Sequence, residues 1–271
     1  MKVSLIISVY KNVSDLKVIL DGLRFQTLSD FEVIISEDGN DTDMRKFIQD
    51  YDWRWSVHHI HQPDHGWRKN KALNQAILKS RGDYLIFIDG DCVLHHRFIE
   101  HHVQFAKPNR ILAGKRVKLG PGYSALFRNN IVELKELENR IAREFKSLKH
   151  DGGRFFEEGI YINPHGWLRI IPKLRRMKHL KGCNMSFYRH AIERINGFDE
   201  DYVLPAVGED ADLAWRFRIL NYEMFSLRNI AIQYHLHHPE NWISQDENLQ
   251  LMHNKIKAQQ VVCLNGLKKY S

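Results

Sequence analysis

Pairs of acidic residues follow apolar runs in the first third of the sequence. Asp89 and Asp91 come directly after residues 84–88, and Glu37 and Asp38 follow an earlier run. Two carboxylates one residue apart at a strand end point to the same side, and the glycine between them lets the backbone turn sharply. Such a pair suits a divalent cation with oxygen ligands, and the cation suits a diphosphate. A surface turn is the alternative, because aspartate and glycine are common there.

A third acidic group opens a predicted helix. Residues 208–212 read GEDAD, and Leu213, Phe217 and Leu220 form the apolar stripe that follows. Acidic residues in a first helical turn often only offset the helix dipole. The alternative is a catalytic role, in which one of these carboxylates is a general base held at a helix start that faces the strand ends.

Three histidines, His235, His237 and His238, lie within four residues after a strand-like stretch. Alternate residues on a strand share a face, so His235 and His237 are expected to reach one site. Histidine is a good ligand for Mn²⁺ and a poor one for Mg²⁺. With 16 histidines in the chain, chance clustering is the alternative. The other histidine pairs are expected to be structural or at the surface: residues 58–59, 95–96 and 101–102.

A basic segment, residues 66–71 (GWRKNK), precedes a helix predicted at residues 69–80. Cations at a helix start oppose the macrodipole, so an anion explains them better than helix stability does. The segment therefore predicts a diphosphate contact, with a solvated basic turn as the alternative. The glycine patterns of a P-loop and of a dinucleotide fingerprint are absent from the sequence.

The first 120 residues alternate between predicted strands and helices. This order is typical of a mixed, mainly parallel α/β sheet with helices on its faces, in which ligands collect at the carboxyl ends of the strands. Both acidic pairs fall at such ends. Ser14 is expected to cap the first helix. Strands are expected at residues 3–9, 31–36, 56–60 and 84–88, and helices near residues 14–23, 43–51 and 69–80.

The remainder of the chain contains no linker rich in proline or serine, so we expect a single domain. We divide it into residues 1–240, with halves at 1–120 and 121–240, and a helix within 241–271 that packs on the body. A charged helix is expected at residues 132–145.

Composition excludes several protein classes. The 271 residues include 40 Lys+Arg and 33 Asp+Glu, a net charge of +7, with 43% hydrophobic and 27% charged residues. These are the proportions of a water-soluble globular protein rather than a disordered, collagenous or coiled-coil one. Three scattered cysteines favour a reducing compartment. No apolar run is long enough for a signal peptide or a membrane span, so a cytoplasmic location is expected.

The positive charge favours acidic partners. Part of it is clustered at Lys173, Arg175, Arg176, Lys178 and Lys181. A solvated helix face is the simpler interpretation, and peripheral contact with anionic lipid at the inner face of a membrane is the alternative. We expect no nucleic-acid partner, because basic and aromatic residues do not gather into one stripe.

Six short motifs follow one another along the chain: residues 8–12 (SVYKN), 36–41 (SEDGND), 89–91 (DGD), 182–187 (GCNMSF), 196–200 (NGFDE) and 208–210 (GED). In this order they resemble the motifs of family 2 glycosyltransferases with the GT-A fold. The last three are similar to the C-terminal part of chondroitin-polymerase-like and galactosyltransferase-like members. The resemblance covers about residues 3–239. Residues 120–180 would then carry acceptor contacts, in which Tyr161 or Trp167 stacks on a sugar ring or is simply a core or loop aromatic.

The resemblance implies an inverting transfer of a sugar from a nucleotide-diphosphate donor, commonly a UDP-sugar, with Mn²⁺ or Mg²⁺. The acceptor would be a glycan or a lipid-linked saccharide in surface polysaccharide or lipopolysaccharide synthesis. Asp210 would be the base and Glu209 would orient substrate hydroxyls. The metal would be held by Asp91, Asp89 and His235. The donor would be contacted by Val9, Tyr10, Glu37, Asp38, Asp89, Gly182, Asn184 and Met185.

The sequence departs from the family pattern in the third helix, where Leu73 rather than arginine precedes Asn74, so Arg68 or Lys71 is expected to supply the charge. Two other functions stay open at this point. A nucleotidyltransferase shares a related fold, but it needs a glycine-rich loop after the first strand, and Lys11 lies in a stretch without glycine. A non-catalytic protein that binds carbohydrate or nucleotide is the other alternative.

Overall fold

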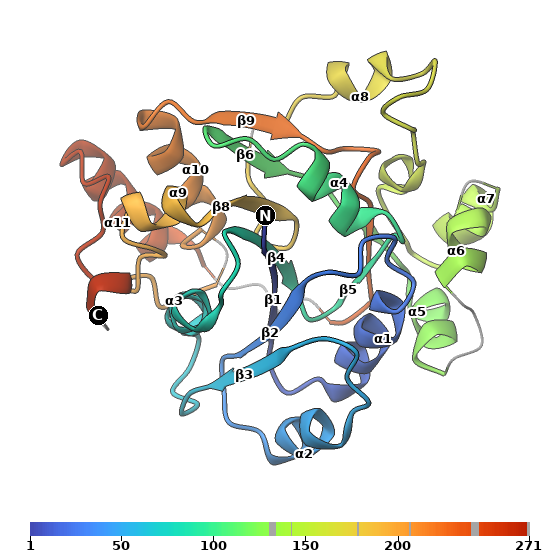
Figure 1. Cartoon of the computed structure of the whole chain (residues 1–271), viewed down its shortest axis with the longest axis horizontal. Coiled ribbons are helices and arrows are strands. Elements are labelled where there is room, and N and C mark those ends of the chain that lie inside the picture. The colour runs from blue at the N-terminus through green and yellow to red at the C-terminus, as the bar shows by residue number, and fades with distance from the viewer. Residues whose placement is uncertain (130–133, 142, 178, 206, 240–243, 270–271) are drawn as a thin grey trace.

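A seven-stranded sheet runs through the centre of the molecule (Figure 1). The structure, a computed structural model, describes residues 1–129, 134–141, 143–177, 179–205, 207–239 and 244–269. The strand order is β3-β2-β1-β4-β8-β6-β9. The strands are β1 (Val3–Val9), β2 (Glu32–Glu37), β3 (Val57–His61), β4 (Tyr84–Asp89), β6 (Arg110–Ala113), β8 (Met185–Tyr188) and β9 (Glu223–Ser226).

Neighbouring strands of this sheet are parallel except in the two pairs that contain β8, which is antiparallel to β4 and to β6. The predicted mixed, mainly parallel α/β sheet is therefore confirmed. A second, three-stranded sheet has the order β5-β10-β7. Its strands are β5 (Cys92–Leu94), β7 (Val117–Lys118) and β10 (Gln233–His235).

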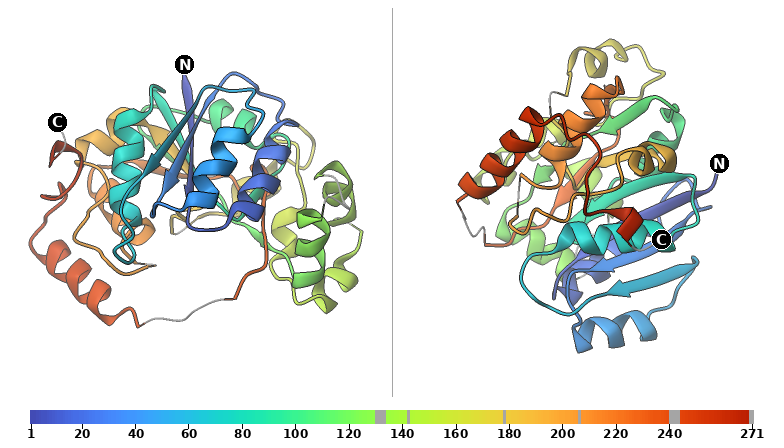
Figure 2. Two further views of the ribbon diagram at one scale, coloured as in Figure 1. Left: turned by 90° about the horizontal axis from the view of Figure 1, so that it is seen from below. Right: turned by 90° about the vertical axis from the view of Figure 1, so that its left-hand side faces the viewer.

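The unbroken apolar run of β1 arises because both faces of the sheet are covered. Leu5 belongs to one buried cluster, together with Leu16 of α1 (Val13–Leu23), while Ile6 belongs to a second cluster, together with Leu73 of α3 (Lys69–Lys79). Successive side chains of a strand point to opposite faces, so each face receives its own core. Figure 2 shows α1 and α3 on opposite sides of the central strands.

The start of α1 corrects one expectation. Asn12, not Ser14, caps the helix: its Oδ1 accepts the backbone N–H of Asp15 at 3.1 Å and the Ser14 hydroxyl at 2.9 Å. The remaining helices of the sheet region are α2 (Thr42–Asp50), α4 (Phe98–Gln104), α9 (Arg189–Arg194) and α10 (Asp210–Ile219).

The middle of the chain forms short helices rather than one long one. The helix expected at residues 132–145 begins outside the described residues, and within them it is interrupted between α6 (Leu134–Ile141) and α7 (Phe145–His150). The turn at residues 143–144 ends the periodicity that the charged pattern suggested. Other elements here are α5 (Pro121–Arg128), the 3-10 turn at Phe156–Gly159 and α8 (Ile170–Leu174).

The C-terminal helix α11 spans Asp246–Lys257, within the expected range of 241–271, and a 3-10 turn follows at Leu267–Lys269. It is fastened to the body by polar groups: the Lys255 ammonium donates to Asp199 and Asp201, and Asn248 Nδ2 donates to the Leu204 carbonyl. None of the helices within the described part of the chain has the length and apolar character required to span a bilayer.

A buried ion pair fixes α10 against the preceding loop. Arg216 NH2 lies 2.5 Å from Asp212 Oδ2, and both side chains are buried. The Tyr202 hydroxyl and Trp215 Nε1 each donate to Asp212 Oδ1 at 3.1 Å. Arg216 NH1 donates to the carbonyl of Ile195 at 3.0 Å. This network sets the position at which α10 begins.

We expect Asp212→Ala to lower the free energy of unfolding by about 3–5 kcal/mol, because it leaves the Arg216 guanidinium buried without a counter-charge. Urea denaturation measures the change. The matched control is Glu136→Ala, which removes the exposed ion pair to Arg140 and should cost about 0.5 kcal/mol at most. An Asp212→Ala protein as stable as the control would contradict the assignment.

Candidate active site

Three parallel strands bring their carboxyl ends to one edge of the sheet. In the observed register Ser8 is opposite Asp89, and Val9 is opposite Glu37. A cavity of about 480 Å³ opens at this edge. Of the predicted site residues, those that line it are Val9, Tyr10, Asp38, Asp89 and Asp91.

Asp38 is held in a fixed orientation at the cavity wall. Its Oδ1 accepts from Gln62 Nε2 at 2.7 Å, and its Oδ2 accepts the backbone N–H of Arg68 at 2.6 Å. On the other side of the cavity, the Gly90 backbone N–H donates to the Ser8 carbonyl at 2.6 Å. A Cβ on Gly90 would come within 2.8 Å of that oxygen, so this close turn between the two aspartates requires glycine.

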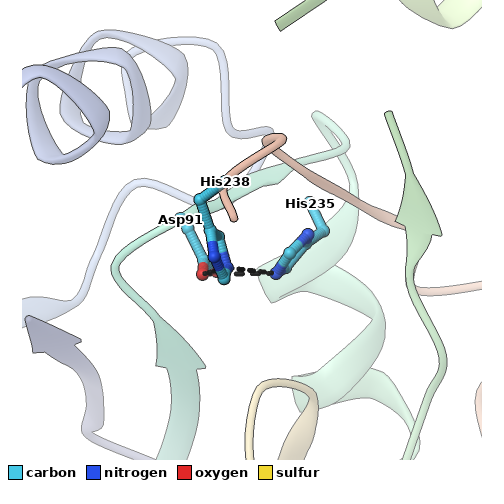
Figure 3. A group of neighbouring side chains, drawn as sticks. All are labelled: Asp91, His235 and His238. Carbon is cyan, nitrogen blue, oxygen red and sulfur yellow. Dashed lines mark hydrogen bonds and ion pairs between the residues drawn. The ribbon is translucent and has the colours of Figure 1, made fainter. Parts of the chain in front are cut away.

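Asp91 lies beside two histidines, as Figure 3 shows. His235 Nε2 and His238 Nε2 are each 3.2 Å from Asp91 Oδ2, and 3.3 Å from one another. The antiparallel pairing of β10 with β5 places His235 opposite Cys92 and so next to Asp91. His238 rather than His237 meets this carboxylate, because β10 and its alternation end at His235 and the irregular segment that follows turns His238 toward Asp91. His237 lines a neighbouring cavity together with His235 and His238.

This cluster pairs an ionised carboxylate with a protonated imidazole, so a metal ion that binds here displaces the proton of His238. Burial alone raises the pKa of Asp91, but the hydrogen bonds from His235 and His238 outweigh it and hold the pKa well below its usual range. The hydrogen bond to Asp91 in turn raises the pKa of His238 to about 9. The three ligand atoms lie within 4.8 Å of one another. One carboxylate with two imidazoles fits Mn²⁺ better than Mg²⁺, which prefers oxygen ligands.

Lys69 supplies the positive charge of the cavity. Its ammonium lies 2.7 Å from Asp89 Oδ1 and 2.8 Å from Glu209 Oε2. Burial lowers the pKa of Lys69, but the two carboxylates reverse the effect and raise the pKa above its ordinary value, so the group is charged. Arg116 NH1 is 3.6 Å from Asp89 Oδ2 and adds a second cation.

Arg68 and Lys71, which were expected to supply this charge, do not line the cavity at the strand ends. Both side chains line a separate cavity of about 210 Å³, together with Glu200 and Tyr202. The Arg68 guanidinium also donates to the Pro63 carbonyl at 3.2 Å. Lys71 follows Lys69 by two positions in α3, so its side chain lies about 200° around the helix axis from that of Lys69 and points away from Asp89.

Glu209 and Asp210 stand at the start of α10, beside Gly182. A Cβ on Gly182 would lie 2.4 Å from Glu209 Oε1, so the bare backbone leaves room for that carboxylate. Burial raises the pKa of Glu209 to about 7, while Lys69 opposes the shift. Burial also raises the pKa of Asp210, opposed by Lys181 and by backbone N–H groups, including that of Gly182. Both groups are stronger bases than free carboxylates.

Three predicted donor contacts lie away from the cavity. Glu37 is fully buried, pairs with His59 Nε2 at 2.7 Å and accepts the Asp41 backbone N–H at 2.7 Å. Asn184 is also fully buried, and its amide donates to two backbone carbonyls while it accepts from His102. Met185 packs in the second core cluster. Each of these side chains is occupied by the interior rather than open to a ligand.

Five of the six histidines in the pairs expected to be structural have partners within the fold, while His58 Nε2 is buried without a hydrogen-bond partner among the described residues. His102 is buried between Asn184 and Ser186, and burial lowers its pKa to about 3. His95 stacks on Tyr161, so this aromatic ring is not free to stack on a sugar. Trp167, the other aromatic considered, is 89% exposed.

Sequence reasoning missed three residues of the site: Lys69, Arg116 and His238. Lys69 lies within the basic segment that predicted an anion contact, and His238 lies within the histidine cluster. The sequence therefore indicated both segments but not which of their side chains would point into the site. Arg116 precedes β7 and carried no local signal, because only the folded sheet brings it to Asp89.

Comparison with known proteins identifies the family. The family description "Glycosyl transferase family 2" matches residues 4–159, and "N-terminal domain of galactosyltransferase" matches residues 172–239. Validoxylamine A glucosyltransferase of Streptomyces hygroscopicus subsp. jinggangensis is 27% identical over 221 residues, which cover 79% of this chain and 50% of that protein. The uncharacterized glycosyltransferase EpsJ of Bacillus subtilis is 31% identical over 110 residues, 40% of this chain and 31% of that protein. The chain spans half or less of the length of these curated relatives.

Solved structures share the fold. TarS of S. aureus in complex with UDP-GlcNAc superposes with a TM-score of 0.60 and 16% identity, over 96% of this chain and 69% of that one. Mannosyltransferase PcManGT of Pyrobaculum calidifontis, in complex with GDP-Man and Mn²⁺, superposes with a TM-score of 0.55 and 15% identity, over 95% of this chain and 62% of that one. The family match at residues 4–159 covers more than half of this chain. The chain therefore belongs to glycosyl transferase family 2, and it has the GT-A fold of these enzymes.

Proposed function

We propose that the chain transfers a sugar from a nucleoside-diphosphate donor, a UDP-sugar, to a hydroxyl of a glycan or lipid-linked saccharide, with inversion at the anomeric carbon. One observation carries the proposal. The ion pairs of Lys69 with Asp89 and Glu209 join a cavity at the strand ends to a partly buried carboxylate pair at the start of α10. A binding protein needs the cavity but has no need of that carboxylate pair.

The nucleotide end of the donor would lie against Tyr10 and Asp38. Tyr10 is 53% exposed at the cavity mouth, where its ring can lie alongside a base. The fixed Asp38 carboxylate and Asp89 are acceptors for base and ribose groups. Lys69 and Arg116 lie where the diphosphate would follow, and their charge would stabilise the negative charge that develops as the nucleotide leaves.

A divalent cation, Mn²⁺ in preference to Mg²⁺, would be held by Asp91, His235 and His238, with Asp89 nearby. The structure supports this by its donor set, which places one anionic oxygen and two imidazole nitrogens around one point. When bound, such an ion neutralises the departing diphosphate as a Lewis acid.

Asp210 would take the proton of the attacking acceptor hydroxyl. A direct displacement needs one base and no covalent nucleophile, and the burial that raises the pKa of Asp210 strengthens it for that role. Glu209, held by Lys69, would orient substrate hydroxyls. The backbone of Gly182 leaves room for the Glu209 carboxylate, and its N–H group donates to the Asp210 carboxylate.

The acceptor side is supported by a second cavity, of about 180 Å³, that borders the histidine cluster. Lys118, Arg154 and His237 line it, which suits an acceptor with phosphate or carboxylate groups, such as a lipid-linked saccharide of surface polysaccharide synthesis. A cytoplasmic site of action is part of the proposal, and the three free, buried cysteines are compatible with a reducing compartment.

We expect metal-dependent release of free nucleoside diphosphate from one member of a panel of UDP- and GDP-sugars. Asp210→Asn should keep donor binding and lower turnover by about 10²–10⁴-fold, because only proton removal is lost. Calorimetry with the nucleotide and a coupled release assay measure the two quantities. The control is the exposed Asp43→Asn on α2, which should match the wild type. Near-normal turnover in Asp210→Asn would remove this residue from the role.

Replacing Asp91 or His238 by alanine should abolish the metal-dependent part of nucleotide affinity, as EDTA does for the wild type. The neighbouring His237→Ala should retain it, because that side chain does not reach Asp91. Titration calorimetry with UDP, with and without Mn²⁺, distinguishes the variants. Equal losses in His237→Ala and His238→Ala, or an unchanged affinity in Asp91→Ala, would contradict the ligand set.

A further inference from the structure

A short amphipathic projection contributes no residue to the cavity described above. Residues 160–177 leave the body at one end of the molecule and carry α8 at their outer side, as Figures 1 and 2 show. Its apolar side chains face outward: Trp167 is 89% exposed, Leu174 is 74% exposed and Ile170 is 61% exposed. Large apolar side chains gathered on one projection mark a contact surface, whereas single ones scattered over a protein do not.

The base of this projection is firmly attached, so the exposure is built into the fold. Pro172 is buried, and the Arg175 guanidinium pairs with Glu158 at 3.1 Å. The Arg175 carbonyl accepts from the Ser226 hydroxyl at 2.6 Å. Pro172 and Arg175 therefore hold α8 against the body, while the side chains of Trp167, Ile170 and Leu174 remain exposed to solvent.

The charge around these apolar groups has one sign. Residues 159–192 contain no aspartate or glutamate. Arg169, Lys173 and Arg176 are exposed, and across the described ranges none of them forms an ion pair with an acidic side chain. Arg175 is committed to Glu158, and Lys178 of the predicted basic cluster lies outside the described residues.

A groove continues this surface under α8. It has a volume of about 410 Å³, with Arg169, Lys173 and Arg176 beside the apolar side chains of Phe225 and Met224. Glu223 also lines it, but its charge is neutralised by Arg110 at 2.8 Å. Cations beside an apolar floor match an amphiphile that carries a negative headgroup.

We propose that α8 and its flanking residues bind the surface of an anionic bilayer, with Trp167, Ile170 and Leu174 inserted at the headgroup level and Arg169, Lys173 and Arg176 on the lipid phosphates. Only this partner uses both features. Nucleic acid and acidic glycans attract the cations but gain little from isoleucine and leucine, and a second copy of a chain with charge +7 is repelled by the cations. The proposal is independent of the transfer chemistry above.

The test is co-sedimentation of the full chain with large vesicles, of phosphatidylcholine alone and of phosphatidylcholine with phosphatidylglycerol. We expect binding to the anionic vesicles only, weakened but not abolished by high salt, because salt screens the charges and leaves the apolar contact. Lys173→Gln with Arg176→Gln should weaken binding about 30-fold, since each basic residue near an anionic surface strengthens it roughly fivefold. Trp167→Ala with Leu174→Ser should weaken it about tenfold or more.

Matched controls make the same changes elsewhere. Lys146→Gln with Lys149→Gln on α7 removes two exposed charges, and Leu264→Ser removes a side chain that is 79% exposed. Both controls should bind like the wild type. Equal binding to neutral vesicles, losses in the controls as large as in the α8 variants, or no vesicle binding would overturn the proposal. So would dimers in sedimentation velocity that the α8 changes dissolve. Nucleotide-sugar turnover measured without vesicles should be unchanged in the α8 variants.

Discussion

A single ammonium group joins the two halves of the site. Lys69 begins α3, and its ammonium lies between two carboxylates. One is Asp89, at the end of β4, and the other is Glu209, which follows Lys69 by 140 residues in the chain. Without a cation between them, these two partly buried carboxylates would repel one another, which favours a proton on one of them. The ion pairs let both stay close to one cavity, and they leave a fixed positive charge at the place where a diphosphate would lie. The position of Asp210, next to Glu209, follows from the same contact.

A second constraint is the small sheet β5-β10-β7. Its antiparallel pairing brings a segment near residue 235 against the residue that follows Asp91, so the histidines reach the carboxylate although more than 140 positions separate them in the chain. Arg116, next to β7, lies beside Asp89, which also pairs with Lys69, so two cations compensate the Asp89 carboxylate. The negative charge of a nucleotide would enter a site in which the charge of Asp89 is already compensated, which lowers the cost of binding it.

Much of the fold could be predicted from the sequence, and less of the site. The run of β1 was predicted to the residue, because a β-branched stretch buried on both faces leaves a plain pattern. Acidic residues at strand ends were also visible. Side-chain direction was not: Asn184 and Met185 point into the interior. His238 rather than His237 meets Asp91, because the strand ends at His235, two residues before the position to which the alternation was extended. Long-range pairs such as Arg116 with Asp89 leave no trace in local spacing.

The central claim is that Asp91, His235 and His238 hold a divalent cation against a nucleoside diphosphate in the cavity. The most direct measurement is the anomalous diffraction of crystals grown with UDP and Mn²⁺. The account predicts one manganese peak within coordination distance of the Asp91 carboxylate and of both Nε2 atoms, with the diphosphate on its open side near Lys69. A nucleotide bound without a peak there, or a peak on Glu209 and Asp210 instead, would contradict it.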